Sequence, residues 1–288
     1  MTKEIALEHA PDLPRIYATA VRRRGSSSAT LPDVRYSRAG IRVDVDDLVD
    51  YARVCGFPVG GALPPTYPHL VAFPLQMAVM SGDGFPLPLL GAVHVENRIE
   101  VVRPITLDDR LDVAVWAADL RPHHRGRQVD LVSEVSVRGD VVWRGTSTYL
   151  SRGSEHPEAT PSEPPSTAPL ERVTAGPVWR LGEATGRAYA AVSGDWNPIH
   201  VHALTARPLG FPSAIAHGMY TYARVLASLG PKLPESGLIS RVWFRKPVRL
   251  PSTVRLRSAF EPSSTLSVLE SVKSGSGDVE HAVVANTW

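Results

Sequence analysis

The 288-residue sequence contains very little cysteine and no long apolar stretch. Its single cysteine, Cys55, excludes an intrachain disulfide and a metal site built from several cysteines, and it suits a reducing compartment. Even the apolar segment 87–95 is interrupted by proline, glycine and histidine, and it is far shorter than the about 20 residues of a membrane span. The first ten residues carry charges where a secretion signal needs an apolar run. We therefore expect a cytoplasmic protein with no membrane span.

The sequence also has no large excess of basic or of acidic residues. The 31 lysine and arginine residues nearly balance the 29 aspartate and glutamate residues, which gives a formal net charge of +2. No basic block is long enough to form a nucleic-acid-binding tail, so we expect no nucleic-acid partner. Hydrophobic residues make up 43% of the chain and charged residues 21%, a composition that supports a packed core rather than a disordered chain.

The length is about twice that of a common domain. Residues 151–169 are rich in proline, serine and glutamate and contain almost nothing to bury, which is typical of an extended linker. The sequence therefore predicts an N-terminal domain over 1–150, a linker over 151–170 and a C-terminal domain over 171–288.

The two halves share weak sequence matches in the same order. The segment YARVCGF at 51–57 resembles YAAVSGD at 189–195, with an offset of 138 residues. Two shorter matches follow, 103–107 with 246–250 and 139–141 with 277–279. Three matches in one order suggest a duplicated unit.

Each half also predicts the same order of elements, a short helix, a longer helix and then four strands. In the first half these are helices over 46–54 and 69–81 and strands over 93–102, 111–120, 128–138 and 141–151. In the second half they are a helix over 181–191 that stops before Gly194, a helix over 219–229, and strands over 238–244, 253–260, 266–273 and 279–287. The longer helix of each half is apolar with small residues, so the expected packing is a curved antiparallel sheet around it. This predicts the α+β class, with two tandem hot-dog domains.

The candidate catalytic residues lie around Asn197 and Pro198. Because Pro198 keeps Asn197 out of a helix, the segment must turn and can bring Asp195 and His200 to one point, where they could hold a water or transfer a proton. Asn197 could brace that turn by an Asx-type bond to its own backbone. Residues 216–218 open the long helix, whose free N–H groups and positive end suit a developing oxyanion.

From Tyr189 through Ala206 the sequence resembles the MaoC-like family, also called hydratase 2 or R-specific enoyl-CoA hydratase. The shared pattern is a tyrosine, then Ser-Gly-Asp, any residue, and Asn-Pro-Ile-His, and the words GF at 210–211 and IAHGM at 215–219 extend it. The first half resembles the family only through its element order and the weak repeat. The whole arrangement is similar to that of the double-hot-dog 3-hydroxyacyl-thioester dehydratases of actinobacterial type.

The resemblance implies reversible dehydration of an (R)-3-hydroxyacyl thioester to a trans-2-enoyl thioester in fatty-acid metabolism. Asp195 and His200 would then be the acid/base pair, Asn197 would support the loop, and the Gly218 N–H would bind the thioester oxygen. The substrate would be carried by coenzyme A or acyl carrier protein, and the reaction would need no metal or cofactor.

Further residues are candidates for binding the substrate. The basic cluster at 241–249 could meet the phosphates of coenzyme A or an acidic carrier protein, although surface solvation is the alternative. Tyr67 and the apolar run 70–80 could line an acyl tunnel, with core packing as the alternative. The candidate substrate-binding residues are Ser213, His217, Arg241, Arg245, Lys246 and Tyr67. A metal cluster of Asp195, His200 and His202 is disfavoured, because the two histidines would point to opposite faces of an extended segment.

The first half lacks the acid/base pair. The offset of 138 places Phe57 opposite Asp195 and Ala62 opposite His200, so this half is expected to be catalytically silent and, by resemblance, to accommodate the acyl chain. The two halves would form a pseudo-dimer within one chain, and a homodimer of chains is possible. The alternative functions are thioester hydrolysis and non-catalytic binding of acyl thioesters.

Overall fold

The computed structural model describes residues 2–20, 30–89, 91–153, 155–272 and 279–288. The chain divides into two compact units, residues 1–48 with 61–162 and residues 49–60 with 163–288. The end of the strand predicted over 266–273 and most of the repeat match at 277–279 lie outside the described residues. Among the described residues, no helix is long and apolar enough to cross a membrane.

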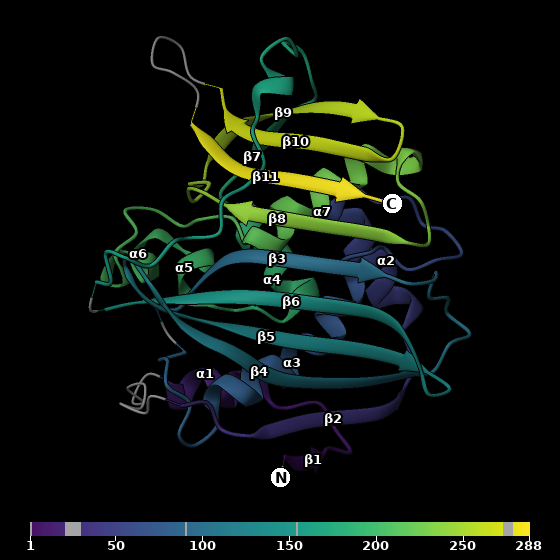
Figure 1. Ribbon diagram of the computed structural model, residues 1–288, viewed down its shortest axis with the longest axis vertical. Coiled ribbons are helices and arrows are strands. Elements are labelled where there is room, and N and C mark those ends of the chain that lie inside the picture. The colour runs from purple at the N-terminus through teal and green to yellow at the C-terminus, as the bar shows by residue number, and fades with distance from the viewer. Residues whose placement is uncertain (1, 21–29, 90, 154, 273–278) are drawn as a thin grey trace. The chain divides into compact units, whose positions relative to one another are not determined.

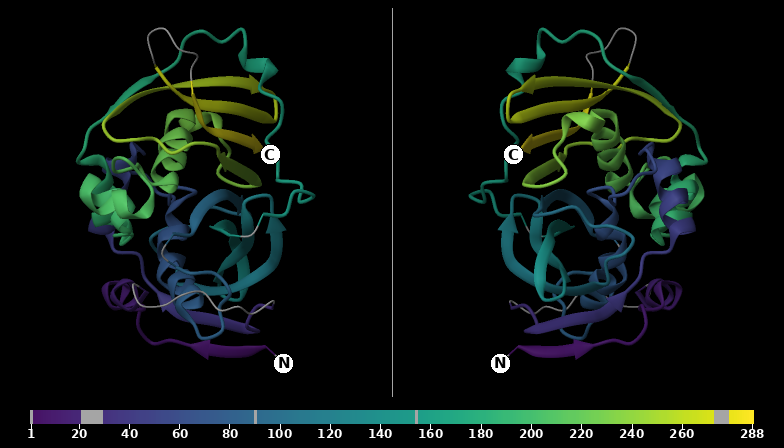
Figure 2. Two further views of the ribbon diagram at one scale, coloured as in Figure 1. Left: turned by 90° about the vertical axis from the view of Figure 1, so that its left-hand side faces the viewer. Right: turned by 90° about the vertical axis from the view of Figure 1, so that its right-hand side faces the viewer.

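The first unit is a curved sheet packed against one long helix (Figures 1 and 2). The strand order is β1 (Lys3–Ala6), β2 (Val34–Ile41), β4 (Leu111–His123), β5 (Gly126–Val137), β6 (Asp140–Arg152) and β3 (Val93–Val101). Strand β1 runs parallel to β2, and the other neighbours are antiparallel. Helix α3 (Tyr67–Ser81) packs on β2, β4 and β5, and helix α1 (Leu13–Ala20) packs on α3.

Helix α3 is apolar on nearly all sides, which is why it is enclosed by the sheet rather than lying on the surface. Met77 and Met80 of the predicted acyl tunnel are both buried in the core of this unit. The buried Gln76 side chain donates a hydrogen bond to the Ser133 hydroxyl at 3.0 Å and thereby ties the helix to β5. A role of this helix in an acyl tunnel stays a prediction.

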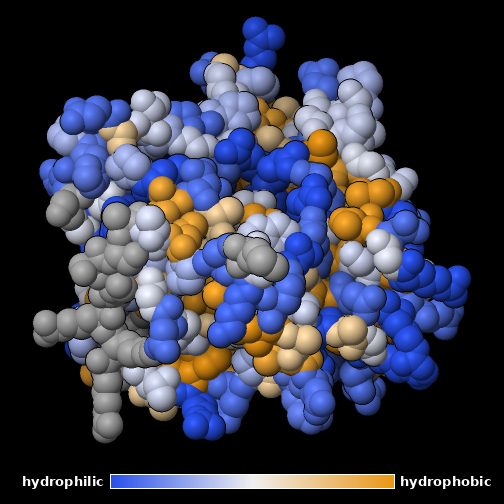
Figure 3. Space-filling view, turned by 60° about the horizontal axis from the view of Figure 1, so that its bottom comes forward, coloured by the Kyte–Doolittle hydropathy of each residue, from blue (hydrophilic) through white to orange (hydrophobic). Residues whose placement is uncertain are grey.

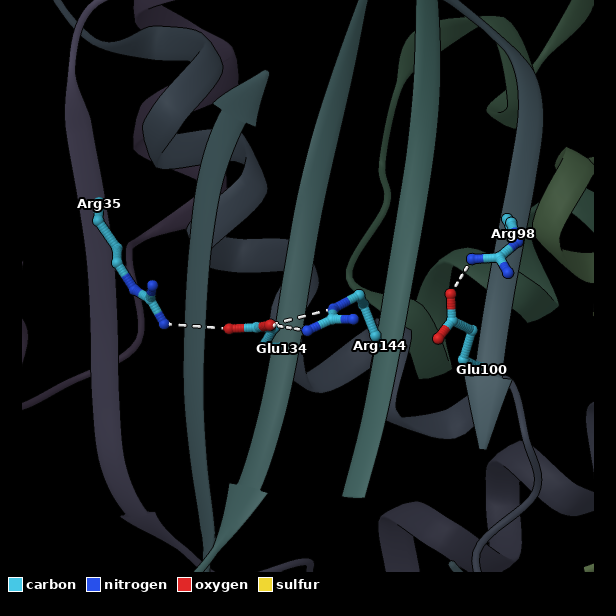
Figure 4. Close-up of polar contacts among 5 residues, drawn as sticks. All are labelled: Arg35, Arg98, Glu100, Glu134 and Arg144. Carbon is cyan, nitrogen blue, oxygen red and sulfur yellow. Dashed lines mark hydrogen bonds and ion pairs between the residues drawn. The ribbon is translucent and has the colours of Figure 1, made fainter. Parts of the chain in front are cut away.

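The opposite face of the same sheet carries ion pairs that run between strands or along one strand (Figure 4). Glu134 on β5 accepts hydrogen bonds from Arg35 on β2 at 3.2 Å and from Arg144 on β6 at 3.0 Å. Arg98 pairs with Glu100 along β3. In the space-filling view, hydrophilic residues cover much of the face shown and apolar residues form separate patches (Figure 3). The alternation of buried and partly exposed residues along β5 places Glu134 on the side of the sheet away from α3.

The second unit repeats the arrangement with a smaller sheet. Its strand order is β7 (Val178–Leu181), β9 (Ser252–Glu261), β10 (Ser264–Ser271), β11 (Glu280–Thr287) and β8 (Leu238–Phe244), all antiparallel. Helix α7 (Gly218–Leu229) is the long helix of this unit and lies against one face of the sheet (Figure 2). Between β7 and α7 the chain forms the short helices α4 (Thr185–Ser193), α5 (Pro198–Val201) and α6 (Ala203–Ala206).

The predicted helices and strands match observed ones to within a few residues, but the sequence does not predict β1, α1, β2, β7, α5 or α6. The strands among these, β1, β2 and β7, lack a clear apolar alternation over a strand of usual length. The predicted helix over 181–191 begins late, at Thr185, because Leu181 pairs with Ser252 at the edge of the sheet instead.

The predicted linker ends in a buried anchor. Leu170 is fully buried against Trp243, Val268 and Val283, and the Arg257 guanidinium donates to its carbonyl oxygen. Residues 168–170 form a single 3₁₀ turn that places this side chain on the sheet. The end of the linker therefore contributes to the core of the second unit.

Leu170→Ala should lower the free energy of unfolding by about 2–5 kcal/mol, because it leaves a cavity against the sheet. Denaturant unfolding followed by tryptophan fluorescence would measure the change. The matched control is Leu204→Ala, since Leu204 is 66% exposed and its truncation should change stability by no more than about 0.5 kcal/mol. Equal, small losses in the two variants would show that the anchor does not stabilise the unit.

Candidate active site

The Asp195 carboxylate is held by the turn that ends α4. Gly194 adopts a left-handed conformation at φ 74°, which a residue with a side chain rarely adopts, and its N–H donates to the Ala190 carbonyl at 2.9 Å. The next residue is Asp195, whose Oδ1 accepts from the Asn197 N–H at 3.1 Å. Its side chain is 22% exposed, so the carboxylate is both fixed by the backbone and accessible to solvent.

Asn197 starts the short helix that carries His200. Its side-chain oxygen accepts from the Ile199 N–H at 3.4 Å, which confirms the predicted Asx-type bond, and Pro198 occupies the first helical position. The prediction of an extended segment through His200 and His202 is wrong, because the asparagine cap and the proline begin a helical turn instead. His200 is buried on this turn, while His202 is exposed and caps the next helix.

The tautomer of His200 follows from its partner. Its Nδ1 lies 2.8 Å from the Ile215 carbonyl oxygen, and a carbonyl oxygen only accepts, so Nδ1 carries the hydrogen. The remaining nitrogen, Nε2, therefore has a bare lone pair. Burial lowers the pKa of His200 below 6.5, although the nearby Asp195 carboxylate opposes this effect. His200 is thus a neutral base at neutral pH.

His217 is stacked on His200 and linked to Asp195. The two imidazole centroids lie 3.7 Å apart with planes inclined by 25°. The His217 Nε2 donates to the Asp195 main-chain oxygen at 2.9 Å, whereas the Asp195 carboxylate Oδ2 is 3.8 Å away, beyond hydrogen-bond reach. Burial, followed by repulsion from His200, lowers the pKa of His217 to about 3. His217 therefore stays neutral and holds the Asp195 loop through its backbone.

Asp195, His200 and His217 form one cluster, in which one potential ligand atom of each lies within 4.8 Å of the others. His202, which the sequence offered as a third member, is not part of the cluster. The nitrogen lone pair of a histidine lies in the plane of its ring. Because the rings of His200 and His217 are stacked, their lone pairs lie in nearly parallel planes and do not converge on one point. A zinc ion needs ligands that converge at tetrahedral angles. This geometry favours proton transfer over joint coordination of an ion.

The N-terminus of α7 follows directly after His217. Gly218 is the first helical residue, a position whose N–H has no partner within the helix. A Cβ on Gly218 would lie 3.0 Å from the Phe244 ring, which is tighter than ordinary contact. The absence of a side chain thus lets β8 approach the start of the helix closely.

The remaining predicted site residues have other partners. The Ser213 hydroxyl donates to the Ala214 carbonyl at 3.3 Å, and the Arg241 guanidinium lies 4.7 Å from the centre of the Trp243 ring. Arg245 pairs with Glu163 at 3.2 Å, and Lys246 is exposed while its carbonyl oxygen contacts the imidazole of His281. Tyr67 belongs to the first unit, where burial and nearby aspartates raise its pKa to about 12. Contact of these residues with a substrate stays a prediction.

Gly186 supports the site but was missed in the sequence. It lies on α4 where that helix meets α5, and a Cβ at this position would be 1.9 Å from the His200 carbonyl oxygen. A glycine within a helical segment was the available signal, since it is unfavourable there without a packing reason. Gly186 therefore permits the close approach that places His200.

Gly186→Ala should destabilise the second unit by about 1–3 kcal/mol, because the new methyl group collides with backbone that cannot move easily. Helix propensity alone predicts the opposite sign, a gain of about 1 kcal/mol. Gly182→Ala is the matched control, since nothing lies within 4 Å of a Cβ there. Urea unfolding of both variants would test this, and a stabilised Gly186→Ala protein would contradict the packing argument.

Comparison with known proteins identifies the family. The family model described as MaoC like domain matches residues 157–280. A 3-hydroxyacyl-thioester dehydratase X of Mycobacterium tuberculosis is 41% identical over 226 residues, which are 78% of this chain and 80% of that protein. The crystal structure of HtdX from the same organism superposes with a TM-score of 0.76 and 35% identity, covering 88% of this chain and 98% of that one. An (R)-specific enoyl-CoA hydratase of Rhodospirillum rubrum is 39% identical over 77 residues, 26% of this chain and 54% of that protein.

The chain belongs to the MaoC-like dehydratase family. Its structural match to HtdX confirms the predicted α+β class and the hot-dog fold. The predicted resemblance to a double-hot-dog dehydratase is confirmed as well, since the match to that protein extends over most of the chain rather than the second half alone.

Proposed function

We propose that this protein is a hydro-lyase that interconverts (R)-3-hydroxyacyl thioesters and trans-2-enoyl thioesters. The observation that carries the proposal is the cluster of the Asp195 carboxylate with two neutral imidazoles, one of which, His200, keeps a bare Nε2. The related proteins named as 3-hydroxyacyl-thioester dehydratase and (R)-specific enoyl-CoA hydratase support the same reaction.

In the hydration direction, the His200 Nε2 accepts a proton from a water molecule whose oxygen attacks C3 of the enoyl group. The Asp195 carboxylate orients that water and stabilises the imidazolium that forms, since its charge favours the protonated ring. The same proton then passes from Nε2 to C2, and the neutral imidazole is restored. One base that takes and returns one proton on one face of the substrate accounts for syn addition.

In the enolate intermediate, the negative charge is shared between C2 and the thioester carbonyl oxygen. We assign its stabilisation to the Gly218 N–H at the start of α7, where the positive end of a 12-residue helix adds to the hydrogen bond. Asn197 supports the reaction indirectly by holding the turn between Asp195 and His200.

The thioester acidifies its own α-carbon, so we propose that no metal or other cofactor takes part. Either coenzyme A or acyl carrier protein would carry the acyl group, with Arg241, Arg245 and Lys246 as candidate contacts for phosphate. A cytoplasmic location agrees with the single cysteine. The pseudo-dimer of the two halves, the role of the first half in acyl binding and the association of two chains stay predictions.

The test is the loss of ultraviolet absorbance of the conjugated enoyl thioester. Purified protein should hydrate crotonyl-CoA or a longer enoyl-CoA, and chiral analysis should find the (R)-alcohol, with no loss of activity after treatment with a chelator. Parallel reactions with enoyl groups on acyl carrier protein would identify the preferred carrier. Release of free thiol without hydration would instead indicate a thioesterase. Binding without turnover at any chain length would indicate a non-catalytic acyl-thioester-binding protein.

A further inference from the structure

The segment 49–60 comes from the first half of the sequence but packs as part of the second unit. It contains the last residues of α2 (Val45–Cys55), and Gly56 ends that helix at φ 82° with its N–H donating to the Ala52 carbonyl at 2.8 Å. Gly194 ends α4 in the same way. The two helix ends that the internal repeat aligns therefore lie in one compact unit, with Phe57 in the place that corresponds to Asp195.

Tyr51 connects this segment to the acid/base cluster through aromatic rings. Its side chain is fully buried, and its ring centroid lies 6.3 Å from that of Tyr189 on α4. The Tyr189 ring lies 4.9 Å from the His217 imidazole, and His217 donates to the main chain of Asp195. A continuous series of buried contacts thus runs from Tyr51 to the backbone of the catalytic carboxylate.

The same segment also contacts α7. The Cys55 thiol is buried, which raises its pKa to about 12, and the nearby side chains of Tyr51 and of Arg224 on α7 oppose this rise. The Arg224 side chain is 3.9 Å from the position that a Cβ on Gly56 would take, and its guanidinium stacks 5.0 Å from the Trp179 ring. The segment is therefore packed against the helix that precedes Asp195, α4, and the helix that follows His217, α7.

We propose that the segment 49–60 is a structural part of the active site and that Tyr51 is a positioning residue for Asp195 and His217. This inference rests on the proposed hydro-lyase function and adds a contribution of the N-terminal half to catalysis itself. Close-packed interiors transmit displacements rather than absorb them, so removal of the Tyr51 ring lets Tyr189 shift away from His217. The Asp195 loop, which is held by His217, then moves with it.

Tyr51→Ala is expected to lower kcat about tenfold or more with KM changed by less than about twofold, because small misplacements of reacting groups slow the chemical step itself. Tyr51→Phe keeps the ring and should retain kcat to within about twofold. Tyr51→Leu fills more of the site than alanine does and provides a second test if Tyr51→Ala folds poorly. The near-ultraviolet circular dichroism of each variant checks that it is folded.

Tyr222→Ala is the matched control. Tyr222 is an equally buried tyrosine of the same unit and lies on α7, but its hydroxyl bonds to Ser240 on the sheet and not to the cluster. Both truncations should destabilise the protein, but only Tyr51→Ala should move the acid limb of the pH profile of kcat/KM. Water that enters beside His217 would raise the pKa of His200 toward its ordinary value, so the limb should move to higher pH.

A readout independent of activity separates this inference from the proposed function. In protein labelled with ¹⁵N-histidine, the imidazole shifts of His200 and His217 should change in Tyr51→Ala and remain unchanged in Tyr222→Ala. Unchanged shifts in the folded Tyr51 variants, or an equal loss of kcat in Tyr222→Ala, would overturn the positioning role. If the wild-type protein hydrates no enoyl thioester but these shifts still respond to Tyr51, the packing argument stands and the hydro-lyase proposal fails.

Discussion

Asp195→Asn is expected to lower kcat for enoyl-thioester hydration by about 10²- to 10⁴-fold, because the proposed base His200 loses the carboxylate that stabilises its protonated form and proton transfer by a positioned base contributes a factor of this size. Asparagine keeps the shape of the side chain and an oxygen that can accept from the Asn197 N–H, so the turn should survive. It removes the negative charge that stabilises protonated His200. The loss should therefore fall on kcat rather than on folding, and steady-state kinetics with crotonyl-CoA would measure it.

Asp130→Asn is a suitable control for this variant. Asp130 is a half-buried aspartate of the first unit that accepts a hydrogen bond from the Thr148 hydroxyl at 2.7 Å. Its replacement removes the same charge from a site without imidazoles and should leave kcat near the wild-type value. Wild-type turnover by a folded Asp195→Asn protein would require a different residue as the catalytic carboxylate.

His200→Ala should reduce kcat to a similar extent, because Nε2 of this residue is the base in the mechanism proposed above. Groups that act as a unit show strongly non-additive losses, so the double variant with Asp195→Asn should be only slightly slower than either single variant. Losses that multiply in the double variant would mean that the two side chains act in separate steps. Unfolding by urea would show that each variant remains folded.

The pH profile gives a second test of His200. Catalysis needs the neutral imidazole, and burial lowers its pKa, so the acid limb of kcat/KM should lie below pH 6.5 in the wild type. The groups that face this ring are the Asp195 carboxylate, which opposes the shift, and His217, which is neutral. His200→Ala should lose this limb, and a wild-type limb above pH 6.5 would contradict the burial argument.

The two buried imidazoles also predict how stability depends on pH. In the unfolded chain both histidines take up protons below about 6.5, whereas in the folded protein they resist protonation down to lower pH, about 3 for His217. The unfolded state therefore binds more protons in this range, and the free energy of unfolding should decrease as the pH falls from about 6.5. Above that pH both states are neutral at these residues and the contribution is constant.

The sequence predicts the proposed acid/base pair better than its surroundings. Asp195 and His200 are recognisable because proline and asparagine between them force a turn, and the asparagine cap is itself a local signal. The hydrogen bond from His217 to a main-chain oxygen and the contact of Gly186 with His200 are set by the packing of separate helices. Tyr51 lies 138 residues from Tyr189, and no local pattern indicates that their rings meet.

The same distinction holds for the fold. Helix α7 and the inner strands follow from apolar periodicity and α3 from a continuous apolar run, whereas β1 and β7 are short strands with exposed residues whose pairing depends on a neighbour already in place. Composition alone predicts that the proline-rich segment is an extended linker. It does not reveal that Leu170, at the end of this segment, packs into the core of the second unit.

The acceptors that set both imidazole tautomers are main-chain oxygens, those of Ile215 and Asp195. A carbonyl group is present whatever amino acid is encoded at its position, so no single codon change can delete either acceptor. Protein engineering that aims to remove either acceptor would have to redirect the course of the chain by insertion, deletion or proline exchange. The tautomers of the two rings therefore do not depend on which side chains are encoded at these two positions.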